Sequence, residues 1–367
     1  MSEIADSVIC IKLQPDSGDI IGRIRELIIR PKYIYAFDIA QQMIFVFDKT
    51  GKFVAKLNKR GQGPDEYLHI GPVFIDDNEE YIEIVNYISP KPTVLKYSNI
   101  NFELMETHPF PDVNFNTCRR HNGFYYFAIQ QLDNIVNGKK TIGGIIVYDD
   151  RNNGKVLFDK TIDTGHSSFS VNAESFTKNE KNELFVSLMY DNTFYRLEGG
   201  EAYPVYAVDF GKYGINNSIG LEPIEKQFSY IKNANDLATF PVLTVNNASI
   251  MSFMYYFKQD KEERFYRETD LRQYVKIKNS NKVYHTKRFK NDLTDFPDNV
   301  YVGSYFYDCV REAMYENYLV YIVWPEFYFD NDTKKVFVDG IGEITAFDDP
   351  IIVMVKLKDH IVSDIGK

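Results

Sequence analysis

The sequence predicts an all-β fold built from short antiparallel strands. The first indication is the segment 33–57, where three runs of about five aromatic and aliphatic residues are each followed by polar turn residues, a pattern typical of strands and their turns. The connections between these runs are too short to contain a helix, so neighbouring strands must be antiparallel. The second indication is composition, because aromatic residues make up 15% of the chain and flat rings pack well between sheets.

The segment 33–57 and the loop after it form one predicted unit. Its strands are Tyr33–Asp38, Met43–Asp48 and Phe53–Leu57. Gly51 supplies the positive φ that a tight hairpin turn needs. The loop 61–64 (Gly-Gln-Gly-Pro) ends the last strand, because glycine frees the backbone and Pro64 has no N–H to donate to a ladder.

Similar strand spacing recurs through the rest of the chain. Strand-like segments separated by turn residues fall into five or six units of roughly 50–60 residues, without a clean sequence repeat. Asn122-Gly123 is the strongest hairpin signal among them. Two segments depart from the pattern. Residues 215–227 leave room for a short helix, and Asp308–Tyr318 fits a short helix, with Asp308 as its N-cap, better than a strand.

Two motifs of the first unit, F-D-x-x-G-x-F-V and G-Q-G-P-D-E-Y, carry a family resemblance. The matching residues are Phe47, Asp48, Gly51, Phe53, Val54, Gly61, Gly63, Pro64, Glu66 and Tyr67. Weaker matches lie at 290–293 and at 348–350, just before the strand Ile351–Leu357. Together these segments resemble the NHL-like six-bladed β-propeller family of Bacteroidetes. Residues 110–284 match only as a repetitive β pattern, and Asp65 stands where that family usually has glycine.

The resemblance implies a six-bladed propeller of four-stranded antiparallel meanders, with residues 1–367 forming a single domain. A propeller needs a device that closes its ring, and an N-terminal strand donated to the last blade is a common one. We therefore predict that the strand Val8–Leu13 pairs beside Ile351–Leu357. Most members of the family are uncharacterised proteins of the cell envelope, so the resemblance implies a fold and a compartment more than a chemistry.

Charge and cysteine content exclude several classes of protein. The formal charge of −10 argues against nucleic acid and against an anionic membrane surface, since both attract basic proteins. The three cysteines, Cys10, Cys118 and Cys309, are far apart and form no C-x-x-C motif, which argues against a redox or zinc site. We expect the three thiols to be buried. The alternative is a disulfide between two of them, since three cysteines cannot all pair within the chain.

The compartment is inferred from the resemblance. No apolar run approaches the roughly 18 residues of a transmembrane helix, and no signal peptide is visible at the start of the sequence. Members of the family usually carry a lipoprotein or secretory signal. We therefore expect this chain to be the mature region of a longer precursor, with a lipid anchor allowed in that precursor. The expected location is the periplasm, the outer membrane or the cell exterior; the cytoplasm is the alternative.

Two stretches are candidate binding sites. Asp65, Glu66 and Tyr67 follow flexible glycines and could cradle a ligand or a cation, although no Lys-Ser/Thr follows as in a P-loop. The alternative is a tight connection between blades against which Tyr67 packs. Arg119, Arg120 and His121 form a cationic run that could bind an anionic sugar or a carboxylate. The alternative is an ordinary solvated hairpin.

The six histidines are scattered and form no H-x-x-x-H pair, and no G-x-S-x-G motif is present. We expect no cofactor, while a divalent metal in the central channel stays open. The leading hypothesis is a non-enzymatic propeller of the bacterial envelope that binds a ligand or a protein, with carbohydrate or another envelope protein as partner. The alternative is a lyase or hydrolase, acting on a lactone or glycan, with its site at the central channel.

Overall fold

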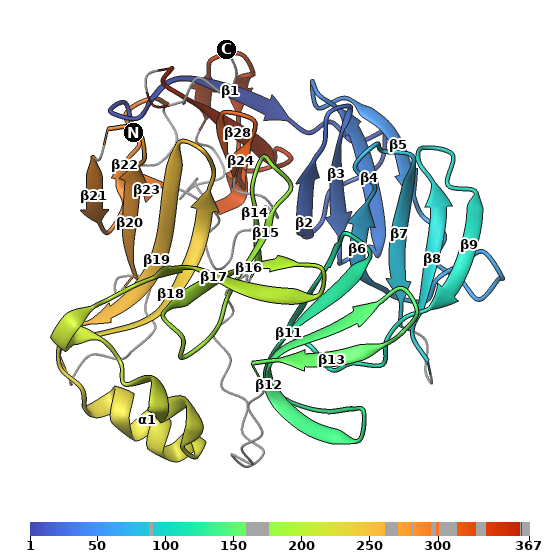
Figure 1. Ribbon diagram of the computed structural model, residues 1–367. Helices are drawn as coiled ribbons and strands as arrows, with labels where there is room; N and C mark the ends of the chain where they lie inside the picture. The colour runs from blue at the N-terminus through green and yellow to red at the C-terminus, as the bar shows by residue number, and fades with distance from the viewer. Residues whose placement is uncertain are drawn as a thin grey trace. The chain divides into compact units, whose positions relative to one another are not determined.

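The computed structural model describes residues 1–87, 91–158, 176–260, 271–280, 282–294, 299–300, 314–327, 335–359 and 361. These residues are mostly β-strand and form six four-stranded antiparallel sheets (Figure 1). The protein is a six-bladed β-propeller, and each of these sheets is one blade, so the predicted fold class is confirmed. Within the described part of the chain, every helix is too short or too polar to span a membrane.

The chain divides into two compact units, which are described separately. Unit 1 comprises Met1–Asp112, Lys290–Asn299 and Asp308–Lys358 and holds blades one, two and six. Blade one consists of β2 (Ile24–Ile29), β3 (Tyr33–Asp38), β4 (Met43–Asp48) and β5 (Phe53–Leu57). Blade two consists of β6 (Ile70–Ile75), β7 (Tyr81–Asn86), β8 (Thr93–Ser98) and β9 (Leu104–Pro109). Blade six consists of β24 (Met314–Tyr315), β25 (Tyr318–Val323), β28 (Ile351–Leu357) and β1 (Ala5–Lys12), with the hairpin β26 (Val336–Val338) and β27 (Gly342–Ile344) inserted between β25 and β28.

Unit 2 comprises Val113–Phe289, Val300–Tyr307 and Asp359–Lys367 and holds blades three, four and five. Blade three consists of β10 (Thr117–His121), β11 (Phe124–Val136), β12 (Lys139–Asp149) and β13 (Gly154–Leu157). Blade four consists of β14 (Phe176–Lys178), β15 (Leu184–Ser187), β16 (Thr193–Glu198) and β17 (Glu201–Ala207). Blade five consists of β18 (Leu237–Asn246), β19 (Ile250–Lys258), β20 (Leu271–Ile277) and β21 (Val283–Thr286). The helix α1 (Ile224–Asn233) lies between β17 and β18. Strands β22 (Phe289–Lys290) and β23 (Asn299–Val300), which follow β21 in the chain and form a two-stranded pair, each have one residue in either unit.

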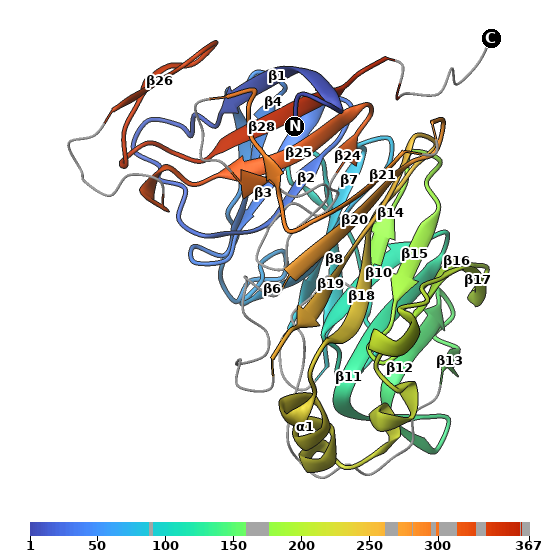
Figure 2. The same ribbon diagram turned by 90° about the vertical axis from the view of Figure 1, so that its left-hand side faces the viewer.

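The N-terminal strand closes the last blade as predicted. Strand β1 pairs antiparallel with β28, with Lys12 opposite Ile351 and Val8 opposite Val355. The two strands lie side by side in both views (Figures 1 and 2). The observed strand starts at Ala5, earlier than the predicted Val8, and contains a bulge between Ala5 and Ser7. The expectation of a single domain over residues 1–367 stays a prediction.

The predicted helix at 308–318 needs correction at its C-terminal end. Residues 308–313 lie outside the described residues, but Met314 and Tyr315 form β24 and pair with Leu319 and Tyr318 of β25. Glu316, in the turn between them, has a φ of 51°. Pairing with a neighbouring strand therefore outweighs the helical spacing of apolar residues at this point. Within 215–227, where a short helix was expected, α1 begins at Ile224.

The buried faces of the blades follow the alternation of side chains along each strand. In β4, Phe45 and Phe47 are fully buried in a cluster that includes Val320 and Ile352 of blade six. Ile44 and Val46 point the other way and pack in the cluster shared with blade two. Both faces of blade one are covered by neighbouring blades of unit 1, which is why its inner strands are apolar at nearly every position. Each such side chain stabilises the fold by about 1.5–3 kcal/mol.

Gly51, the glycine of the first family motif, lies where the chain leaving β1 meets the turn between β4 and β5. Its φ is +86°, and a Cβ added to it would lie 2.2 Å from the carbonyl oxygen of Lys12. The Gly51 carbonyl accepts the N–H of Gln14 at 2.8 Å. The motif therefore needs glycine for two reasons, its backbone conformation and the close approach of the closing segment.

The second motif forms the connection from blade one to blade two. The buried Tyr67 hydroxyl donates to the Gln42 carbonyl at 2.8 Å and accepts the N–H of Lys59 at 3.2 Å. The Glu66 carboxylate accepts the N–H of Gly63 at 2.7 Å, and a Cβ on Gly61 would lie 1.9 Å from a carboxylate oxygen of Glu66. The side chains of Glu66 and Tyr67 thus hold the corner through hydrogen bonds to backbone groups.

Replacing Gly51 with alanine should destabilise the protein by about 2–4 kcal/mol, because it adds a clash with the Lys12 carbonyl to the cost of a positive φ. Gly18→Ala is the matched control, since Gly18 has a φ of +90° and no described atom within 4 Å of an added Cβ. The control should lose only the conformational cost of about 1–2 kcal/mol. Urea denaturation measures both. Equal losses in the two variants would show that the contact with the closing segment contributes nothing.

Candidate functional site

The three candidate residues of the corner between blades one and two are largely engaged in the fold. Tyr67 and Glu66 bond to backbone groups of the corner. Only Asp65 presents a half-exposed carboxylate, and it pairs with the Lys59 ammonium at 2.7 Å. The hydrogen bond and the charge of Lys59 hold the pKa of Asp65 below its usual range. This geometry favours the interpretation of the loop as a connection between blades; a ligand role for it stays a prediction.

The cationic run Arg119–His121 lies in β10 and is divided between two faces of its sheet. Successive side chains of a strand point to opposite sides, so Arg119 and His121 share one face and Arg120 takes the other. Arg119 donates to the carbonyl of Cys118 at 2.8 Å. Arg120 pairs with Asp150 at 3.4 Å, and His121 is buried. The run therefore does not gather into one cationic cluster, and anion binding by it stays a prediction.

The hairpin after this run is as predicted. Asn122 and Gly123 have φ values of 48° and 79°, the left-handed pair that a two-residue hairpin turn requires. The Asn122 side-chain amide lies 3.2 Å from Nε2 of His121. The turn thus fixes the imidazole at the end of β10.

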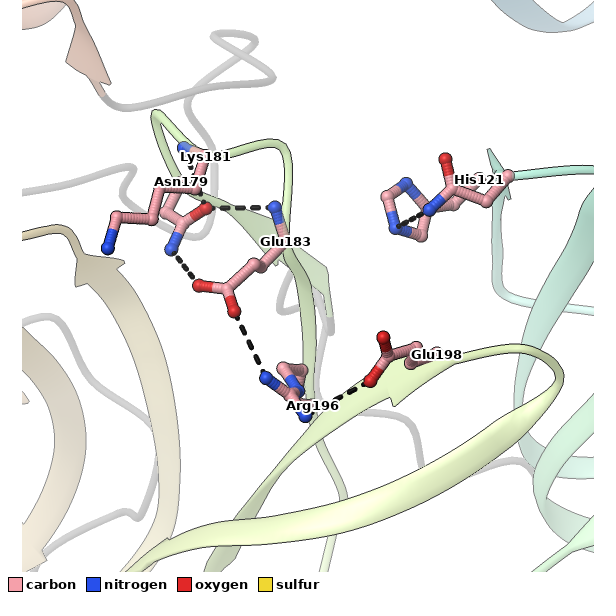
Figure 3. Close-up of polar contacts among 7 residues, drawn as sticks. His121, Asn179, Lys181, Glu183, Arg196 and Glu198 are labelled. Atoms are coloured by element: carbon pink, nitrogen blue, oxygen red, sulfur yellow. Dashed lines mark hydrogen bonds and ion pairs between the residues drawn. The ribbon is translucent and has the colours of Figure 1, made fainter.

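A polar network in blade four, which the sequence did not indicate, is the strongest candidate site. It begins in the turn between β14 and β15, where the Asn179 side-chain oxygen accepts the N–H groups of Lys181 at 3.1 Å and Glu183 at 2.9 Å. The Asn179 amide donates to Oε2 of Glu183 at 2.7 Å (Figure 3). One asparagine therefore shapes the turn and also orients the Glu183 carboxylate.

Arg196 of β16 joins this turn to the end of its own strand. Its Nη1 lies 3.2 Å from Oε1 of Glu183 and its Nη2 lies 3.0 Å from Oε2 of Glu198 (Figure 3). Arg196 and Glu198 are two residues apart on one strand and so project from the same face. The guanidinium carbon also lies 5.9 Å from the ring centroid of Tyr203, which stands opposite Arg196 in β17.

The electrostatics of the network favour fixed charges. The hydrogen bond from Asn179, and then the guanidinium of Arg196, lower the pKa of Glu183 despite partial burial. The carboxylate therefore stays ionised and is poorly suited to give up a proton as a general acid near neutral pH. What the arrangement can do is hold planar polar groups in a set orientation toward a ligand.

In the described ranges, no group of three or more His, Cys, Asp and Glu side chains is arranged to hold a metal ion. A metal in the central channel stays untested. Cys10 is a free cysteine, and burial raises the pKa of its thiol to about 11. Cys118 is buried. Cys309 lies outside the described residues.

The fold is similar to solved structures of Bacteroides proteins. One is a presumed exported protein from Bacteroides fragilis, with a TM-score of 0.62 and 16% identity over 96% of this chain and 95% of that chain. Another is a member of the DUF4221 family from Bacteroides vulgatus, with a TM-score of 0.52 and 12% identity over 96% of this chain and 97% of that chain. At these identities the similarity shows the fold and nothing further.

Sequence comparison shows the family. No match to the chain was found among curated proteins. The profile of one family, described as "Domain of unknown function (DUF4934)", matches residues 1–356. That match includes the closing strand β1, both motifs of blade one and nearly all of β28. The chain therefore belongs to the DUF4934 family.

Proposed function

We propose that this protein is a non-enzymatic binding propeller of the bacterial cell envelope, with a ligand-binding surface around Arg196 in blade four. The observation that carries the proposal is the chain of contacts from Asn179 through Glu183 and Arg196 to Glu198. Such a chain holds charged groups in place before a ligand arrives, which lowers the entropy lost on binding.

The same contacts favour binding over catalysis. A catalytic acid needs a pKa raised toward the working pH, whereas the pKa of Glu183 is lowered. Both carboxylates on Arg196 are ion-paired. Groups of this kind position a ligand and do not exchange protons with it.

The envelope location is supported by the family resemblance of the motifs and by the similarity in fold to a presumed exported protein. We also propose that the chain is related to the NHL-like six-bladed propellers that its motifs resemble. Fractionation of cells that express the full-length gene tests the location. Recovery of the protein with the periplasmic or outer-membrane fraction supports it, and recovery with cytoplasmic markers contradicts it.

Arg196→Ala should weaken ligand binding by about tenfold or more, because it removes charge-assisted hydrogen bonds and frees two carboxylates. The measurement is a binding screen with soluble oligosaccharides and short peptides, with mass analysis for any product. Lys96→Ala is the matched control, since Lys96 also pairs with a carboxylate, that of Glu106, and lies 3.9 Å from a tyrosine ring centroid. Binding unchanged in Arg196→Ala, or chemical conversion of a bound compound by the wild type, would contradict the proposal.

Ligand binding should be independent of pH between about 5.5 and 9. The folded pKa of Glu183 is lowered, so its contribution is present above the ordinary carboxylate pKa and is lost only as pH falls through the lowered value. Titration calorimetry in buffers across this range measures the affinity. A transition near pH 6 or 7 would instead point to a histidine or to a carboxylate of raised pKa.

A lyase or hydrolase is the second candidate, and Asp349 is the observation that favours it. This residue precedes β28, and burial, with a smaller effect from Asp348, raises its pKa. A raised pKa is the property of a general acid. If the protein turns over a lactone or a glycan, Asp349→Asn should reduce the rate by about 100-fold or more, while Asn in place of the exposed Asp112 (Asp112→Asn) should leave it unchanged. Full activity in Asp349→Asn would exclude this role.

A further inference from the structure

We infer that the surface formed by Tyr203, Arg196 and Glu198 binds a neutral, hydroxyl-rich ring such as a pyranose sugar. The inference rests on the proposed function and names the ligand class of the same site. Its three residues lie in the hairpin of β16 and β17, where Arg196 stands opposite Tyr203 and Glu198 stands opposite Glu201.

Tyr203 supplies an apolar platform. Strand β17 is the last strand of its sheet, so no further strand of blade four covers it on that side. The residue is 46% exposed, so part of its ring is open to a ligand. A tyrosine ring offers an apolar face and a polar hydroxyl, and the C–H groups on one face of a sugar ring match the apolar face.

Glu198 and Arg196 supply hydrogen bonds beside the platform. The Glu198 side chain is 63% exposed, and Oε2 is held by Arg196. Among the described residues, Oε1 of Glu198 has no hydrogen-bond donor. Each terminal nitrogen of arginine carries two N–H groups, so Nη1 and Nη2 of Arg196 each keep one beyond the carboxylate contacts. An acceptor and a donor side by side suit the neighbouring hydroxyl groups of a sugar.

The charges of the cluster disfavour ionic ligands. Arg196 already occupies the cation position next to the Tyr203 ring and is ion-paired with both Glu183 and Glu198, so a second cation would find the ring position taken and the carboxylate charge largely compensated. The two carboxylates outnumber the single guanidinium, so an anion is repelled. A neutral ligand that both donates and accepts hydrogen bonds remains.

Titration calorimetry with defined probes tests the inference. The probes are the neutral trisaccharides maltotriose, cellotriose and chitotriose, the anionic tri-galacturonate and the cationic peptide tri-lysine. A neutral trisaccharide should bind, and Tyr203→Ala should weaken it by about tenfold or more. Tyr203→Phe keeps the platform and should stay within about threefold of the wild type. Thermal unfolding by circular dichroism confirms that each variant is folded.

Tyr230→Ala is the matched control, because Tyr230 of α1 is 38% exposed and outside the proposed surface; it should bind like the wild type. Preference for tri-galacturonate or tri-lysine overturns the ligand class and leaves the binding function standing. Binding that is insensitive to Tyr203→Ala overturns the site. If no probe binds at millimolar concentration, the inference fails, whereas conversion of a probe to products overturns the proposed function itself.

Discussion

The ladder between β1 and β28 is the constraint on which the rest of the last blade depends. It joins strands from opposite ends of the chain, and its continuation is held by the hydrogen bond from the Leu13 N–H to the Pro350 carbonyl at 3.2 Å. Without β1, strand β28 would present an unpaired edge, which is a liability in any sheet. The segment after β1 then crosses the turn at Gly51, so closure of blade six and the shape of blade one are set by the same few residues.

Much of this fold could be predicted because the information is local. Strands Tyr33–Asp38, Met43–Asp48 and Phe53–Leu57 were predicted with the bounds that the structure shows, since alternating apolar residues and short turns specify an antiparallel meander. The predicted helix at 308–318 was wrong at residues 314–315. The backbone conformation there depends on pairing with β25, which lies later in the chain. Short apolar runs fit a helix and a strand almost equally well, and only the neighbouring strand decides between them.

The candidate site could not be predicted in the same way. The run Arg119–His121 was predicted as a candidate binding site because its charges are adjacent in sequence. In a strand, however, adjacent side chains point to opposite faces. The network on Arg196 is less visible, because Glu183 comes from a hairpin turn and meets Arg196 only through the register of β15 and β16. The one signal available was the spacing of Arg196 and Glu198, two positions apart in a predicted strand. Sequence proximity and spatial proximity coincide in turns and diverge across a sheet.

The pairing of β1 with β28 also means that blade six cannot be completed until late in synthesis. Lys12 and its ion-pair partner Asp348 are separated by 336 residues. At about 5–20 residues per second, the first strand waits on the order of 20–70 seconds before the ribosome has delivered its partner. Throughout that interval the nascent chain carries a strand without a neighbour, open to pairing with the wrong edge. Any chaperone that escorts this chain would have most reason to hold the strand Ala5–Lys12.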